Sequence, residues 1–259
     1  MKLLCLNLWG GRQGSLLTDY LKQESASTDI FCFQEVFDSP SELEKNDGAR
    51  MHLWEELKIL LPGFQGFFAE SYSGWIDKTK VDFPVRTGQA IFVKRGLEVK
   101  ETGNFYVYGD KNTKILSNFE NEPKNVQYAK LLVLDKEILI LNVHGKWHPG
   151  NKLDTPERIE QSKIILDFLK KFSCPKIVCG DFNLMPNTKS IAILEEAMEN
   201  LISTYKITNT RNKISWEENK NIQHFADFTF VSPDVRIKSF RVPYNEVSDH
   251  LPMLLEFDI

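Results

Sequence analysis

The sequence predicts a mixed α/β protein built on packed β-sheets, and two patterns indicate this. Short apolar segments recur along the chain, and their lengths and their Val, Ile and Phe content are typical of buried strands. Helix-like stretches separate some of these segments, which indicates parallel pairing, whereas others are joined directly, as across Lys136, which indicates antiparallel pairing. The strand segments are 2–9, 29–37, 89–94, 129–135, 137–144, 176–182, 226–232 and 251–257.

The clearest helix is expected over 155–172. Thr155 can cap it, Pro156 suits its first turn, and an apolar stripe follows at helical spacing, formed by Ile159, Ile164, Ile165, Phe168 and Leu169. Weaker patterns predict further helices over 14–25, 49–61 and 188–199. The polar stretches 109–125 and 206–224 are expected to be loops, and either could form a lid or a partner surface.

The composition limits which domain organisation and which binding partners are possible. The chain has 259 residues, of which 42% are hydrophobic and 26% charged, so it is long enough to bury a core without a metal or disulfide staple. Because no repeat or linker divides it, we expect a single domain over 1–259. The net charge of −4 argues against a strongly basic grip on nucleic acid, although a local basic patch remains compatible with it.

The cysteines and the N-terminus favour a cytoplasmic protein. Cys5, Cys32, Cys174 and Cys179 lie in or beside apolar segments without CxxC spacing, which predicts buried, reduced thiols. The apolar N-terminal run is short, Asn7 interrupts it, and no small-residue cleavage site follows. No stretch of about 20 apolar residues is present, so neither a membrane span nor stable membrane association is expected. We expect a monomer.

Unusual polar residues stand inside or at the ends of the apolar segments. Rigid strands aim such side chains into the crevice beyond the sheet, where ligands gather. Each has an ordinary alternative: Asn7 could satisfy a strand edge, Glu35 could pair with a surface lysine, His144 could be a core histidine, and Asp181 could be a turn or cap residue. Several strand ends together favour a site. The residues are Asn7, Gln34, Glu35, Asn142, His144, Asp181, Asn183, Asp227, Asp249 and His250.

The stretch 180-GDFN-183 shows how such a site could be built. In extended chain Asp181 and Asn183 point to the same side, Phe182 points back into the core, and Gly180 leaves room for backbone or ligand to approach. Carboxylates and amides are hard ligands that suit Mg²⁺ or Mn²⁺, and histidines beside carboxylates suit proton transfer. Metal-assisted hydrolysis of a phosphate ester fits this set. No GxxxxGK[ST] loop or GxSxG elbow is present, which disfavours nucleotide-cradling and serine-hydrolase mechanisms.

Six blocks, in order along the chain, resemble the endonuclease/exonuclease/phosphatase (DNase I-like) superfamily. They are 5-CLNLWGG-11, 33-FQEVF-37, 141-LNVHG-145, 179-CGDFN-183, 226-ADFTFV-231 and 247-VSDHLPM-253. The resemblance implies a four-layer α/β sandwich: two mixed β-sheets packed face to face, helices outside, and the site at one rim. It also implies a Mg²⁺-dependent phosphoesterase, with Mn²⁺ able to substitute, acting on a phosphodiester or phosphomonoester.

The resemblance implies a role for each matching residue. Glu35 looks like the metal-binding glutamate, with Asn7 near the metal, and Asp249 looks like a further metal ligand. Asp181 would orient or deprotonate the attacking water, Asn183 would bind the phosphate or that water, and His250 would contact the scissile phosphate with Asp227 orienting it. His144 matches a phosphate-contacting or general-acid histidine. Whether Asp181 or His250 is the base stays open.

Two departures from the family pattern narrow the expectation. Trp9 stands where apurinic-site enzymes carry an acidic residue, and Gln127 is the nearest candidate for the glutamate that DNase I-like enzymes place beside the general-acid histidine. The segment 144–152 could ring the pocket with Lys146, Trp147, His148 and Lys152, and a loop over 72–88 could bring Trp75 and Arg86 to the same rim.

The leading prediction is therefore a nuclease-like phosphodiesterase with a phosphate-ester substrate, nucleic acid included. The alternatives are a sphingomyelinase or inositol-phosphate type of phosphoesterase and a non-catalytic phosphate-binding module on the same scaffold.

Overall fold

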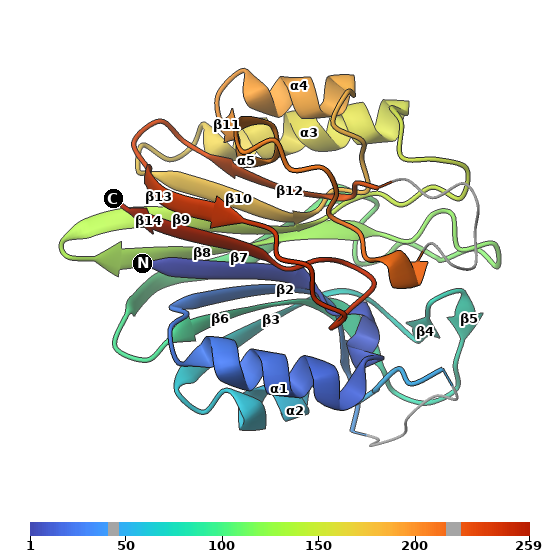
Figure 1. Cartoon of the computed structure of the whole chain (residues 1–259). Helices are drawn as coiled ribbons and strands as arrows, with labels where there is room; N and C mark the ends of the chain where they lie inside the picture. The colour runs from blue at the N-terminus through green and yellow to red at the C-terminus, as the bar shows by residue number, and fades with distance from the viewer. Residues whose placement is uncertain (41–46, 216–223) are drawn as a thin grey trace.

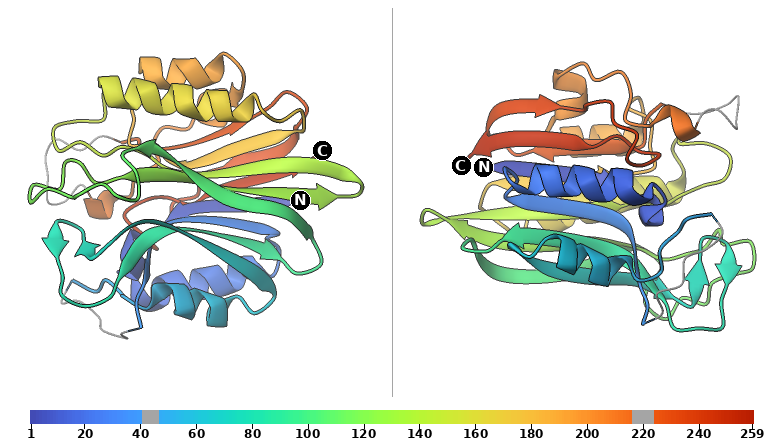
Figure 2. Two further views of the ribbon diagram at one scale, coloured as in Figure 1. Left: turned by 180° about the vertical axis from the view of Figure 1, so that it is seen from behind. Right: turned by 60° about the horizontal axis from the view of Figure 1, so that its bottom comes forward.

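Two six-stranded sheets lie face to face at the centre of the computed structural model, which describes residues 1–40, 47–215 and 224–259 (Figure 1). Helices α1 (Gly14–Ser25) and α2 (Leu53–Leu60) lie outside the first sheet, and α3 (Pro156–Leu169) and α4 (Lys189–Glu195) lie outside the second (Figures 1 and 2). The predicted four-layer sandwich of mixed sheets is confirmed.

The strand order places the earliest and latest strands together. The first sheet has the order β13-β14-β1-β2-β6-β3, with bounds β1 Lys2–Asn7, β2 Ile30–Asp38, β3 Phe64–Ser73, β6 Arg86–Lys94, β13 Arg236–Arg241 and β14 Met253–Asp258. The second has the order β11-β12-β10-β9-β8-β7, with bounds β7 Glu98–Tyr108, β8 Lys124–Val133, β9 Lys136–His144, β10 Lys176–Asp181, β11 Glu199–Asn200 and β12 Asp227–Val231. The short elements are η1 Trp9–Gly11, β4 Trp75–Ile76, β5 Thr79–Lys80, α5 Leu201–Thr204 and η2 Lys213–Ser215.

Alternation along the strands explains the layers. In β1, Leu3 and Cys5 join the cluster shared by both sheets, whereas Leu4 and Leu6 pack in the cluster that includes Leu17 of α1. Successive side chains of a strand point to opposite faces, so a strand that is apolar throughout is buried on both faces. This burial on both faces explains the continuous apolar runs seen in the sequence.

Pairing directions follow the connections. β1 and β2, joined through α1, are parallel, as are β9 and β10, which are joined through α3. β8 and β9, joined directly around Lys136, are antiparallel. Both predictions about pairing are confirmed.

The helices differ from the prediction in their ends and in one buried face. The helix over 14–25 is confirmed, whereas α2 and α4 are shorter than predicted. In α3, Thr155 caps as predicted by accepting from the N–H of Arg158, but the buried face is not the simple apolar stripe that was expected. Ile165 and Leu169 are buried, Ile159 is half-buried, and the polar Arg158 and Gln161 are fully covered.

The polar stretches are loops where they are described. Between β7 and β8, residues 109–123 contain no helix or strand, and β8 begins at Lys124. In the other stretch, 206–215 holds the short 3₁₀ turn η2 and an isolated bridge between Arg211 and His250, and 216–223 lie outside the described residues. The expected loop over 72–88 instead contains the β4–β5 hairpin and the start of β6.

Two further features bear on the expectations. Cys5, Cys32 and Cys179 are buried free thiols and Cys174 is a half-buried one. Within the described ranges, none of the helices has the length and apolar character needed to cross a bilayer.

Candidate active site

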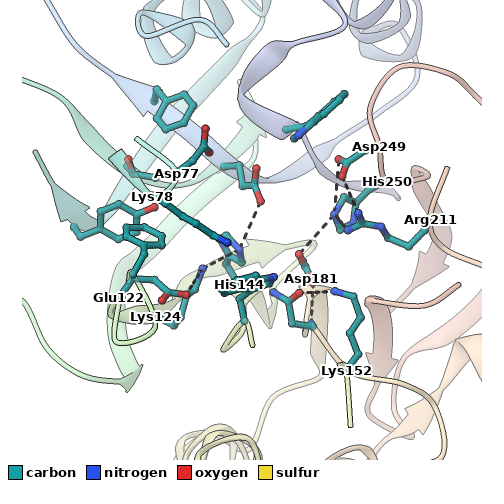
Figure 3. Close-up of a pocket in the computed structure, with 18 residues that line it drawn as sticks. Asp77, Lys78, Glu122, Lys124, His144, Lys152, Asp181, Arg211, Asp249 and His250 are labelled. Carbon is teal, nitrogen blue, oxygen red and sulfur yellow. Dashed lines mark hydrogen bonds and ion pairs between the residues drawn. The ribbon is translucent and has the colours of Figure 1, made fainter. Parts of the chain in front are cut away.

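The polar strand ends meet in a cavity of about 320 Å³ at the rim of the sandwich opposite the chain termini (Figures 1 and 3). Six of the ten polar residues singled out at or inside the strands line it: Glu35, His144, Asp181, Asn183, Asp249 and His250. Asn7 and Asp227 lie directly behind them. The cavity has the size of a small-molecule site.

A β-bulge aims Glu35 into the cavity. The register between β2 and β6 shifts between Phe33 and Val36, and Glu35 has a left-handed φ of 55°. Such bulges re-aim side chains beside active sites, and strained backbone gathers there. Gln34, the neighbouring polar residue, turns into the core and donates to Asn142 Oδ1 at 2.5 Å. Gln34 and Asn142 therefore serve the sheet interface and do not line the cavity.

Asn7 joins two of the carboxylates. Its Nδ2 lies 3.0 Å from Glu35 Oε1 and 3.2 Å from Asp181 Oδ2, and it donates to both. Its Oδ1 accepts from the N–H of Trp9 at 3.0 Å, which holds the turn where Trp9 takes a φ of 51° and enters the cavity wall. The side chain of Asn7 thus fixes Glu35 and Asp181 relative to each other.

Asp181 is the last residue of β10, a central strand. In register it faces His144 of β9 on one side and Asp227 of β12 on the other. Its Oδ1 accepts from the N–H of Asn183 at 2.8 Å, so Asp181 stabilises the local turn and also lines the cavity. Burial raises its pKa, but the charges of His250, Lys152 and Arg211 outweigh burial and hold that pKa well below its usual range. Asp181 is therefore ionised at neutral pH.

His250 is held by Asp227 and faces Asp181. Both carboxylate oxygens of Asp227 lie 2.9 Å from Nδ1 of His250, and Nε2 lies 3.7 Å from Asp181 Oδ2. Burial and the neighbouring Arg211 lower the pKa of His250, but Asp227, Asp249 and Asp181 together raise it above its ordinary value. The ring can therefore carry positive charge near neutral pH.

Arg211 is a cavity residue that the sequence analysis missed. Backbone hydrogen bonds between 210–212 and 249–251 fix its place, with Asn212 N–H donating to Asp249 O and Leu251 N–H to Thr210 O, both at 2.8 Å. Its Nη2 donates to Asp249 Oδ2 at 2.8 Å, and its Nη1 lies 2.5 Å from His250 Nε2. No motif marks Arg211, because it lies in a stretch whose only sequence signal was polarity.

His144 stands beside a lysine rather than the expected glutamine. Lys124 Nζ lies 3.2 Å from His144 Nε2, and Glu122, itself buried, lies 3.6 Å from the same ammonium. Burial and then the charge of Lys124 hold the pKa of His144 well below its ordinary value, so the ring is neutral. Gln127 instead pairs in register with Asn142 and donates to Phe67 O at 2.8 Å.

The segment 144–152 divides into residues that line the cavity and residues that do not. Trp147 and Lys152 line it, and Lys152 Nζ donates to Asn183 Oδ1 at 2.5 Å. Burial lowers the pKa of Lys152 to about 8. Lys146 turns away, because its ammonium lies 3.3 Å from Glu122 Oε2 and over the ring of Tyr108. His148 is exposed and accepts from the N–H of Gly150 at 3.0 Å.

Neither residue proposed from 72–88 reaches the cavity. Arg86 pairs with Asp38 and lies over the ring of Phe68, and Trp75 packs against Phe119 with ring centroids 5.8 Å apart. The wall on this side comes instead from Tyr72, Asp77, Lys78 and Phe119, which the sequence analysis did not single out.

The oxygen ligands fit a hard divalent cation. Ligand atoms of Glu35, His144 and Asp181 lie within 4.8 Å of one another, and so do those of Asp181, Asp227 and His250. The second group is already used by the hydrogen bonds between Asp227 and His250. Burial, followed by the charge of Asp249, raises the pKa of Glu35. A divalent ion beside Glu35 and Asp249 would relieve this repulsion, as expected for a carboxylate-rich Mg²⁺ site.

Comparisons with known proteins agree with this architecture. The family model described as Endonuclease/Exonuclease/phosphatase family matches residues 4–250. The endonuclease/exonuclease/phosphatase from Bacteroides vulgatus superposes with a TM-score of 0.72 at 17% identity over 100% of this chain and 98% of that one. The Bacteroides thetaiotaomicron mannosyl-6-phosphatase superposes with a TM-score of 0.71 at 19% identity over 100% of both chains. The human Nocturnin catalytic domain with bound sulfate superposes with a TM-score of 0.71 at 17% identity, over 100% of this chain and 93% of that one. At these identities the likeness shows the fold. No curated protein matched the sequence.

Proposed function

The chain belongs to the endonuclease/exonuclease/phosphatase family, and we propose that its cavity hydrolyses a phosphate ester by attack of water on phosphorus. One observation carries the proposal: His250, held by Asp227, faces Asp181 in the cavity (Figure 3), and a ligand atom of Glu35 lies within 4.8 Å of one of Asp181. This is the combination of groups that metal-assisted hydrolysis requires.

Each of these side chains has a task that its environment supports. Asp181 and Asn183 hold the attacking water, and the proton passes to Asp181 as the water oxygen bonds to phosphorus and becomes more acidic. The bond between phosphorus and the ester oxygen breaks in the same reaction, and the leaving alcohol takes its proton from solvent water. His250, kept cationic by Asp227, donates to a phosphoryl oxygen and stabilises the charge that develops there. Arg211 lies next to His250 and supplies further donors on the same side.

Glu35 and Asp249 would hold Mg²⁺, with Mn²⁺ able to substitute, and the bound ion would neutralise charge on the phosphoryl oxygens. Asn7 would keep Glu35 in place through its hydrogen bond. His144, neutral beside Lys124, would accept a hydrogen bond from that lysine and shape the floor of the site.

The cavity walls favour a small phosphate ester over a nucleic-acid duplex. Lys78, at the tip of the β4–β5 hairpin, lies 4.5 Å from the ring centroid of Trp147, so hairpin and loop meet across the cavity mouth. A duplex needs a long positive groove, and the net charge is −4. The nuclease-like alternative would instead use a single strand whose bases stack on Trp9 or Trp147.

The test measures hydrolysis of 4-nitrophenyl phosphate, bis(4-nitrophenyl) phosphate, a hexose phosphate and single-stranded DNA in Mg²⁺ or Mn²⁺. We expect turnover of at least one substrate that EDTA stops. Asp181→Asn should lower kcat by about 100-fold or more, the scale for losing a positioned proton-transfer group. Asp167→Asn, an exposed change on α3, serves as control. Full activity of Asp181→Asn would overturn the proposal.

A further inference from the structure

Lys152 presents a cation to the cavity with most of its donors unused. Its hydrogen bond to Asn183 Oδ1 is the only one that its ammonium makes within the described parts of the chain, and a lysine ammonium has three donors. Across the same described residues, no carboxylate lies within ion-pair distance of it. The cavity wall thus carries a partly buried ammonium with two donors unused in the described parts of the chain (Figure 3).

The backbone around Lys152 is tied down from α3. Arg158 is fully buried and spends its guanidinium on carbonyl groups, with Nε 3.0 Å from Lys146 O and Nη1 2.9 Å from Asn151 O and 2.6 Å from Leu153 O. The carbonyl of Lys152 itself accepts from the N–H of Met185 at 2.8 Å. Both neighbours of Lys152 and its own carbonyl are therefore fixed.

Ordering a surface loop through a buried arginine that donates to three of its carbonyl groups costs free energy. Burying a guanidinium costs free energy unless its donors are satisfied, and Nη2 of Arg158 has no hydrogen-bond partner within the described part of the protein. The arrangement has a purpose if the loop must hold one side chain in place. Lys152 is the residue between the two clamped carbonyls, and it is the one that enters the cavity.

We propose that Lys152 is a catalytic residue that contacts a phosphoryl oxygen of the substrate, and that Arg158 is the residue that positions it. The inference deepens the proposed function and rests on it for the word catalytic. The ligand class is a phosphate or phosphoryl group, whose oxygens would accept the two remaining donors of the ammonium while Asn183 keeps the third. The effect would be tighter phosphate binding in the ground and transition states.

The experiment measures orthophosphate binding by ³¹P NMR titration in Mg²⁺, which needs no turnover. Lys152→Met should weaken binding by about 10- to 100-fold, the range for one hydrogen bond to a charged group, and Lys152→Arg should restore part of it. Lys163→Met, an exposed change on α3, should bind like the wild type. Unchanged binding by Lys152→Met, or no binding by the wild type, overturns the proposal. Wild-type binding without hydrolysis of any substrate overturns the proposed function alone.

The positioning role is tested by non-additivity. Arg158→Met should weaken phosphate binding by no more than Lys152→Met does, and the double variant should bind no more weakly than Lys152→Met. Asn151→Ala tests the same role without touching the core, because it removes the Oδ1 that accepts from the N–H of Leu153 at 2.9 Å. Its effect should vanish in the Lys152→Met background. Additive losses in both cycles would leave Arg158 with a structural role only.

Discussion

Both carboxylate oxygens of Asp227 lie 2.9 Å from Nδ1 of His250, and neither side chain is exposed. The contact fixes the ring so that Nδ1 carries its proton toward Asp227 and Nε2 faces the cavity, where Arg211 and Asp181 lie. The residues that meet here come from three separate segments. Asp227 begins β12, Arg211 precedes η2 and His250 precedes β14.

Asp227→Asn should lower kcat by about 100-fold or more without unfolding the protein. Asparagine can keep the hydrogen bond to Nδ1, but it cannot supply the negative charge that raises the pKa of His250. Steady-state kinetics and thermal unfolding of the same sample check this. Asp234→Asn, an exposed change in the turn after β12, is the matched control. Wild-type kcat in Asp227→Asn would show that the pair does not assist the reaction.

Glu35→Gln should raise the Mg²⁺ concentration needed for half-maximal activity by about 10-fold or more. The substitution keeps the shape and the hydrogen bond from Asn7 Nδ2, but removes one of the charges that attract the ion. Activity measured against Mg²⁺ concentration, with Glu70→Gln on β3 as control, checks this. An unchanged Mg²⁺ dependence would show that Glu35 does not bind the ion.

Burial explains which strands could be predicted. The eight strands recognised in the sequence are the interior strands of the two sheets, β14-β1-β2-β6 and β12-β10-β9-β8. The four strands of these two sheets that were missed, β13, β3, β11 and β7, include both edges of each sheet. Interior strands are covered on both faces and read as continuous apolar runs, whereas an edge strand such as β7, with the sequence EVKETGNFYVY, mixes exposed and buried positions.

The site divides in a similar way. Residues inside or at the ends of strands, such as Glu35 and Asp181, interrupt apolar runs and therefore stand out in the sequence. Arg211 and Lys124 do not, because a charged residue in a polar stretch carries no sign of burial. Arg86 and Lys146, which the sequence allowed at the rim, lie away from the cavity because each finds an acidic partner, Asp38 or Glu122, that sequence spacing does not reveal.

Gly180→Ala should destabilise the protein by about 3 kcal/mol or more. Gly180 has a φ of +143°, and an added Cβ would lie 2.0 Å from the carbonyl oxygen of Val143 in the neighbouring strand, where backbone cannot give way cheaply. The room that the glycine leaves is thus taken by β9. Urea unfolding measures the loss, and Gly63→Ala, which meets nothing within 4 Å, is the control. Equal stability of the two variants would contradict the packing argument.

Asp154→Ala should reduce stability by no more than about 1 kcal/mol, and the reduction should depend on pH. Asp154 accepts from the N–H groups of Lys189 and Ser190 at 2.7 and 3.0 Å at the start of α4. Burial raises its pKa, but hydrogen bonds from Ser190 and Lys189 together outweigh this and lower it. A carboxyl whose pKa is lower in the folded state stabilises that state above the unfolded pKa of about 3.9, and this stabilisation disappears as pH falls through the folded pKa.

The free-energy difference between wild type and variant should therefore be constant from about pH 7 to 5 and shrink below about pH 4. Urea unfolding across this range, with the exposed Asp167→Ala as control, tests it. A difference that grows as the pH falls would show that Asp154 is not held in its charged form by these hydrogen bonds.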